Sequence, residues 1–116
     1  MTKEKRMPIY NKFGGHCAYC GTKIDYKDMQ VDHIVSKRFS EYMCNKEMNN
    51  MENLNPSCRQ CNRYKMANEI EIFREMLTTL HVRLEKIFIY RLAKKYGIVK
   101  ENVWDGKFYF EREEKK

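Results

Sequence analysis

The cysteines of this chain fall into a pattern that suits a metal ion. Four of the five form two CxxC pairs, Cys17 with Cys20 and Cys58 with Cys61, and residues 21–57 lie between the pairs. Four thiolates complete the tetrahedral shell of Zn²⁺, and a filled shell is structural because no water can reach the ion. Such a site can contribute on the order of 10 kcal/mol to the folding of a small domain. The pattern predicts a structural zinc site, with buried or disulfide-bonded cysteines as the alternative.

A second group of chemistry-bearing residues is the adjacent pair Asp32 and His33, in the stretch VDHIVSKRF. The apolar residues around the pair predict a strand over Met29–Val35, and neighbours on a strand point to opposite faces. We therefore expect different roles for the two side chains. A carboxylate oxygen suits Mg²⁺ or Mn²⁺, whereas an imidazole with an ordinary pKa of about 6.5 suits a general base. The alternative is a capping aspartate beside a core histidine.

The residues around the second cysteine pair add polar groups. If a helix begins near Cys58, Asn62 and Lys65 lie one turn apart on one side, and Arg59 and Arg63 form a second row. The amide oxygen of Asn62 could then reach a metal ion, with basic side chains beside it for a phosphate. The alternative for these polar residues is a solvated helix face.

Taken in order, the segments CAYCG, VDHIVSKRF and ENLNPSCRQCNRYK resemble the HNH endonuclease family, whose nuclease core is the ββα-metal fold. The matching segments run from Phe13 to Met66, and their conjunction is more specific than any one of them. The resemblance implies an α+β fold with a small ββα-metal nuclease core over 13–66, stapled by the four-cysteine zinc site. A helical extension over 67–116 would complete a single domain, 1–116.

The resemblance also implies roles for individual residues. Asp32 and Asn62 would be the ligands of a catalytic divalent ion, Mg²⁺ or Mn²⁺. His33 would take a proton from the attacking water, and Asn53 would order the loop beneath this histidine. Lys65 would contact phosphate. The implied reaction is the hydrolysis of DNA phosphodiester bonds, and one metal ion is expected because the site offers a single carboxylate.

The composition agrees with a polyanionic partner. The 116 residues include 23 Lys and Arg against 16 Asp and Glu, a formal net charge of +7, which favours nucleic acid over an anionic membrane surface. No apolar stretch approaches the roughly 18 residues of a membrane span, and the N-terminus is too polar for a signal peptide, so we expect a cytoplasmic protein. Contacts with phosphate are expected from six basic side chains: Lys12, Lys37, Arg38, Arg59, Arg63 and Lys65.

Helices, loops and a second strand must position these residues. A basic tail leads into a short helical turn in IYNKF, and residues 36–53 are expected to form a loop. No Gly or Pro interrupts Ala67–Tyr96, which predicts one long helix, or two with a bend near Thr78 and Thr79. The alternating segment KFYFE predicts a short terminal strand.

The sequence leaves two other classes of function open. A non-catalytic, zinc-stabilised nucleic-acid-binding module would share the charge and the cysteines, but it gives no reason for Asp32, His33, Asn53 and Asn62 to occur together. A protein-interaction domain would use the Met-rich and aromatic surface. The apolar stripe of residues 70–96 is expected to pack in the core, with a homodimer interface as the alternative. Whether cleavage would serve phage packaging, restriction, mobility or repair stays open.

Overall fold

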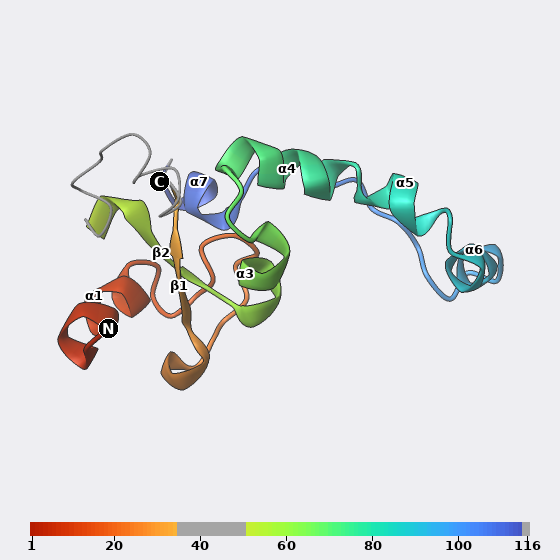
Figure 1. The fold of residues 1–116 in the computed structure, drawn as a ribbon. Coiled ribbons are helices and arrows are strands. Elements are labelled where there is room, and N and C mark those ends of the chain that lie inside the picture. The colour runs from red at the N-terminus through yellow and green to blue at the C-terminus, as the bar shows by residue number, and fades with distance from the viewer. Residues whose placement is uncertain (35–50, 115–116) are drawn as a thin grey trace. The chain divides into compact units, whose positions relative to one another are not determined.

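The structure is a computed structural model that describes residues 1–34 and 51–114 (Figure 1). The chain divides into two compact units. The first unit contains Met1–Ile70 together with Lys107–Lys116, and the second contains Glu71–Gly106. The expectation of one domain over the whole chain stays a prediction.

The first unit is built on a two-stranded antiparallel sheet. Strands β1 (Gln30–His33) and β2 (Leu54–Ser57) pair so that His33 lies opposite Leu54 and Gln30 lies opposite Ser57. Helix α3 (Arg59–Lys65) follows β2 directly and packs against β1 (Figure 1). Two 3₁₀ turns, η1 (Tyr26–Asp28) and η2 (Met51–Asn53), precede the two strands. This mixture of helices and a small antiparallel sheet confirms the α+β class.

Helix α1 (Lys3–Asn11) covers the sheet with an apolar cluster of Ile9, Ile24, Met29 and Leu54. The helix includes the basic segment that was expected to be a tail. Its early start follows from the guanidinium of Arg6, which donates to the carbonyl oxygens of residues 26 and 29 at 3.3 and 3.1 Å. These long-range contacts hold the first turns in place, and a local pattern cannot reveal them.

The second unit contains most of the expected long helix, but in three pieces: α4 (Ile70–Thr78), α5 (Leu80–Leu84) and α6 (Phe88–Lys95). The predicted bend near Thr78 and Thr79 is confirmed. Both threonine hydroxyls donate to the carbonyl oxygen of Glu75, at 3.1 and 2.7 Å, and such bonds compete with regular helix. The second break was missed, and there Ile87 has an extended backbone. No helix in the described ranges is both long and apolar enough to cross a bilayer.

The apolar stripe of the second unit is only partly buried. Phe73 on α4 is 1% exposed, whereas Ile87 and Tyr96 beside α6 are 51% and 73% exposed. The stripe is therefore buried at Phe73 and exposed at Ile87 and Tyr96. The homodimer stays a prediction.

The expected terminal strand is wrong, because residues Tyr109–Glu113 form helix α7. The backbone N–H groups that begin a helix need acceptors from outside it. Here the N–H groups of Tyr109 and Phe110 donate to the carbonyl oxygens of Tyr19 and Ala18 at 3.1 and 2.8 Å. The Glu111 carboxylate also accepts from the backbone N–H of residue 108 at 2.9 Å. The aromatic alternation in KFYFE reflects packing against the first cysteine pair rather than a pleated strand.

We expect Phe108→Ala to destabilise the protein by about 3–5 kcal/mol, because the ring is 1% exposed and its removal leaves a cavity. Phe88→Ala is the matched control, since that ring is 67% exposed, and its cost should stay within about 0.5 kcal/mol. Urea unfolding followed by circular dichroism measures both. Equal losses would contradict the assignment of α7 to the core of the first unit.

Candidate active site and metal centre

The four predicted cysteines come together in the first unit. Their sulfur atoms all lie within 4.8 Å of one another, and the Sγ atoms of Cys20 and Cys58 are 3.8 Å apart. Zn–S bonds of about 2.3 Å place the sulfurs of a tetrahedral site roughly 3.8 Å apart, whereas a disulfide needs about 2.05 Å. All four cysteines are free of disulfide bonds. The cluster therefore fits a tetrahedrally bound metal ion such as zinc.

Tight backbone geometry holds the sulfurs. The N–H of Cys17 donates to the carbonyl oxygen of Thr22 at 2.8 Å, and the N–H of Gly21 donates back to the Cys17 carbonyl oxygen at 3.0 Å. Gly21 adopts a φ of +79°, and a Cβ there would lie 2.6 Å from the ring of Tyr109. In the second pair, Cys58 caps α3 by accepting from the N–H of Cys61 at 3.4 Å.

The sulfurs perturb one another's protonation. The hydrogen bond from Cys17 holds the pKa of the Cys20 thiol below its ordinary value. The pKa of Cys61 is raised by its hydrogen bonds with Cys17 and Cys20 and by burial. Four sulfurs this close cannot all ionise unless a cation compensates their charge. A bound metal ion would supply this compensating charge.

Asp32 and His33 point to opposite faces of β1, as the strand periodicity predicts. Asp32 is 5% exposed and faces α3, while His33 is half-buried. Oδ2 of Asp32 lies 3.1 Å from Nζ of Lys65 and also accepts a hydrogen bond from the hydroxyl of Tyr19. A buried carboxylate needs such partners because burial removes its hydration.

Tyr19 was missed by the sequence analysis. It lies between the two cysteines of the first pair, and nothing in its local pattern signals a contact with the acid. Its side chain is buried, and burial followed by the negative charge of Asp32 raises the pKa of the phenol. Tyr19 therefore stays protonated, and its hydroxyl donates a hydrogen bond to the carboxylate.

The prediction that Lys65 contacts phosphate does not fit this geometry. Lys65 is 0% exposed, and its ammonium contacts Asp32 and donates to the carbonyl oxygen of His33 at 3.3 Å. The ammonium of Lys12 also makes its hydrogen bonds within the protein. It donates to the carbonyl oxygens of Met51 and Leu54 and to the amide oxygen of residue 55, at 3.1, 2.9 and 3.0 Å, and burial lowers its pKa. Both lysines hold the fold together.

Two of the predicted metal ligands, Asp32 and Asn62, have side-chain oxygen atoms available to bind an ion. Oδ1 of Asp32 has no hydrogen-bond partner among residues 1–34 and 51–114. Asn62 lies half-buried on α3, and its side-chain amide likewise bonds to nothing in the part of the chain that is described. Carboxylate and amide oxygens are the ligands that Mg²⁺ and Mn²⁺ prefer. The donor set therefore fits the predicted divalent ion.

Asn53 lies at the end of the hairpin next to His33. Its carbonyl oxygen accepts from the N–H of Ile34 at 2.9 Å, immediately beyond the last pair of the sheet. The imidazole of His33 borders a cavity of about 570 Å³. Its walls come from α1, β2 and the residues beside them: Met1, Thr2, Glu4, Lys5, Pro8, Met51 and Leu54. His33 thus has access to a space large enough for part of a substrate.

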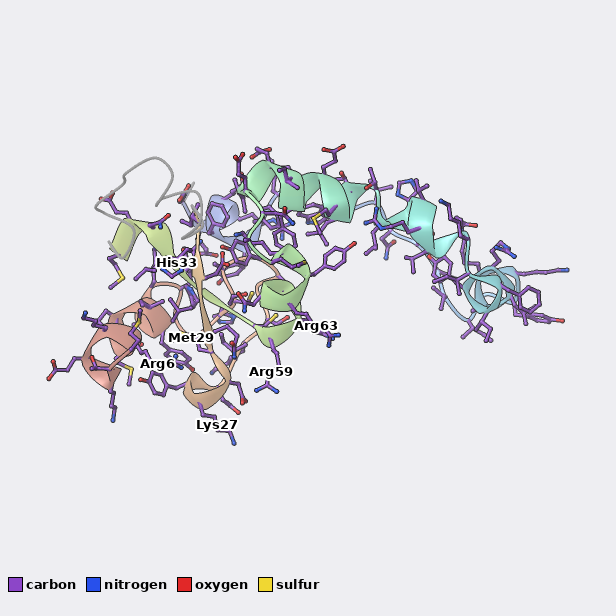
Figure 2. The ribbon with its side chains drawn as sticks, viewed as in Figure 1. Arg6, Lys27, Met29, His33, Arg59 and Arg63 are labelled. Carbon is purple, nitrogen blue, oxygen red and sulfur yellow. The ribbon has the colours of Figure 1, made fainter. Side chains whose placement is uncertain are left out.

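The predicted phosphate-binding arginines are exposed. Arg59 and Arg63 extend outward from α3, and Lys27 extends from the η1 turn (Figure 2). The other two predicted residues, Lys37 and Arg38, lie outside the described residues. Of the six residues predicted to contact phosphate, Arg59 and Arg63 are therefore the two that lie exposed in the described part of the chain.

Part of the chain matches a known protein family. Residues 17–67 match the family model described as HNH endonuclease. The resemblance to the HNH endonuclease family is therefore confirmed over these residues. The matched range contains both cysteine pairs, the sheet and α3, so the four-cysteine cluster and the acid–histidine pair both lie within the matched residues. The match covers under half of the chain.

Among solved structures, the chain is similar to the crystal structure of the type II-C Cas9 enzyme from Actinomyces naeslundii. The TM-score is 0.49 and the identity is 32%, over 61% of this chain and 7% of that chain. The chain thus spans only a small part of the length of that protein. The comparison with curated proteins gave no match.

We expect Lys65→Met to destabilise the protein by about 3–5 kcal/mol, because it leaves the buried carboxylate of Asp32 without its cation. Lys27→Met is the control, since Lys27 is exposed and its removal should cost no more than about 0.5 kcal/mol. Chemical denaturation of both variants and of the wild type supplies the measurement. A Lys65→Met protein as stable as the wild type would rule out a buried ion pair.

Proposed function

We propose that the chain is a metal-dependent endonuclease that hydrolyses DNA phosphodiester bonds. The observation that carries this proposal is the end of β1, inside the HNH domain. There His33 borders a cavity while its neighbour Asp32 keeps one carboxylate oxygen without a hydrogen-bond partner in the described residues. Hydrolysis of a phosphodiester needs a base and an ion ligand, and the end of β1 supplies one side chain of each kind.

In the proposed reaction His33 is the general base. Its imidazole accepts a proton from a water molecule as the water oxygen attacks phosphorus. The bond from phosphorus to the 3′ oxygen then breaks, and the departing 3′ oxygen takes a proton from the solvent. The products carry 5′-phosphate and 3′-hydroxyl ends, as in the family that the chain resembles. Hydrogen bonds hold the backbone on both sides of the imidazole, from Lys65 to the carbonyl of His33 and from Ile34 to Asn53. They keep the base at a fixed position beside the cavity.

The residues proposed to hold the catalytic ion are Asp32, through Oδ1, and Asn62, through its amide oxygen. When bound, Mg²⁺ or Mn²⁺ would supply positive charge against the negative charge that develops on the phosphate oxygens. Asn53 is proposed to keep the hairpin end ordered beneath the histidine rather than to bind the ion.

DNA is proposed as the substrate because the domain belongs to a nuclease family and the chain carries a net charge of +7. The exposed Arg59 and Arg63 on α3 are proposed to contact phosphates. Such contacts would make binding strongly dependent on salt and only weakly dependent on base sequence. The cytoplasmic location stays a prediction.

For the four-cysteine cluster we propose zinc in a structural role. We expect one zinc per chain, and we expect its removal by a chelator to destabilise the first unit by on the order of 10 kcal/mol. Cys61→Ser should lose the zinc, because it removes one of the four sulfurs. Cys44→Ser should keep it, since Cys44 belongs to neither CxxC pair. Metal analysis of the purified proteins measures both, and zinc retained by Cys61→Ser would contradict the site.

We expect His33→Ala to slow the nicking of supercoiled plasmid by about 10²–10⁴-fold, the usual contribution of a general base. The assay uses Mn²⁺ or Mg²⁺ and requires an unchanged zinc content. His81→Ala is the control, because His81 is exposed in the second unit, outside the HNH domain.

The non-catalytic alternative predicts a different result. A zinc-stabilised binding module would retard DNA on a gel but would leave plasmid intact in every variant and with every ion. Equal nicking by the wild type and His33→Ala would also end the proposal, because another protein would then be responsible for the cleavage.

A further inference from the structure

Tyr19 connects the metal cluster with the proposed catalytic acid. It stands between two of the cluster's cysteines, Cys17 and Cys20, and is 3% exposed. Its hydroxyl donates to Oδ2 of Asp32, the same oxygen that lies 3.1 Å from the Lys65 ammonium. One carboxylate oxygen therefore has two buried donors, a phenol and an ammonium.

Contacts from two other segments, residues 108–110 and β2, hold the Tyr19 ring and the backbone beside it in place. Phe108 and Phe110 pack edge-on against it, with centroids 5.6 and 6.1 Å away. The carbonyl oxygen of Tyr19 accepts from the N–H of Tyr109, and the N–H of Ala18 donates to the carbonyl oxygen of Pro56 on β2 at 2.9 Å. The phenol hydroxyl thus has a defined position and cannot follow the carboxylate if that group rotates.

Two fixed donors on one oxygen set the orientation of the whole carboxylate group. With Oδ2 held by Tyr19 and Lys65, Oδ1 is left without a partner among the described residues, and it is the atom assigned above to the divalent ion. We infer that Tyr19 is a positioning residue which, together with Lys65, orients Asp32 so that Oδ1 is presented to the divalent ion. This inference rests on the proposed ion site and adds a residue that acts through Asp32. Removing groups that orient a metal ligand commonly weakens metal binding by about 10- to 100-fold.

In this arrangement the first cysteine pair also positions Tyr19, which lies between its two cysteines. Tyr19 in turn orients Asp32, so its hydroxyl links the cysteine loop to β1. Helix α7 takes part as well, because its aromatic residues and N–H groups support Tyr19 from outside the range matched to the HNH family.

The test is Tyr19→Phe in the full, zinc-loaded chain, which removes the hydroxyl and keeps the ring. Tyr10→Phe is the matched control, because the Tyr10 hydroxyl donates to the carbonyl oxygen of Ile24 at 2.7 Å, in the same unit but away from Asp32. Binding of Mn²⁺ is measured by electron paramagnetic resonance in a His33→Ala background, where no DNA is cut. Asp32→Ala identifies which part of the signal belongs to this site.

We expect Tyr19→Phe to raise the dissociation constant for Mn²⁺ at least about 10-fold, and Tyr10→Phe to leave it unchanged, with the same zinc content in both. With His33 present, the Mn²⁺ concentration for half-maximal nicking should rise in parallel, while the rate at saturating Mn²⁺ is retained. A purely structural role would instead lower stability in both tyrosine variants without changing Mn²⁺ binding, and that result would overturn the inference.

The outcomes separate this inference from the proposed function. If Mn²⁺ binding depends on Tyr19 but the wild type never cuts DNA, the function is wrong and the positioning role stands. If DNA is cut and Tyr19→Phe matches the wild type in Mn²⁺ dependence, the function stands and the positioning role is wrong. Absence of Mn²⁺ binding by the wild type overturns both.

A second variant covers the case in which Tyr19→Phe does not load zinc. Phe110→Leu keeps the phenol but loosens the packing on its ring. It should weaken Mn²⁺ binding in the same direction, and unchanged binding would count against the positioning role.

Discussion

The first unit depends on the convergence of four cysteine sulfurs on one point. Its sheet consists of two strands of four residues each, and a two-stranded sheet of that size is marginally stable in water. The cluster ties the loop around Cys17 to the start of α3, and so closes the chain on both sides of the hairpin. The sheet, the core cluster beneath α1 and the orientation of Asp32 all require this closure.

The closure explains why a buried acid is tolerated in so small a fold. Asp32 is nearly inaccessible to water, yet its charge is balanced by Lys65 from α3 and by the hydroxyl of Tyr19. Both partners are brought to the strand by segments that begin or end at cluster cysteines. The four-cysteine cluster and the acid are therefore two parts of one arrangement, although they lie on different sequence segments.

Much of this arrangement could be predicted because it follows from local sequence patterns. The CxxC spacing specifies a four-sulfur site, and strand periodicity places Asp32 and His33 on opposite faces. The burial of Lys65 could not be predicted, because its partner lies on β1, far away in the sequence. Helix α7 was mistaken for a strand because its first N–H groups find acceptors at Ala18 and Tyr19. The helical start at Lys3 was missed for a similar reason, since Arg6 is anchored on the chain near Met29.

The order of the segments along the chain has a consequence for synthesis on the ribosome. Residues 71–106 form a unit of their own, and only afterwards does the chain supply α7, which packs on the first cysteine pair. The nascent chain can therefore gather its sulfurs and form its hairpin while Tyr19 still lacks its aromatic support. Tyr19, the residue proposed to orient Asp32, gains this aromatic support only when residues 107–113 have left the exit tunnel, after the HNH segment itself has emerged.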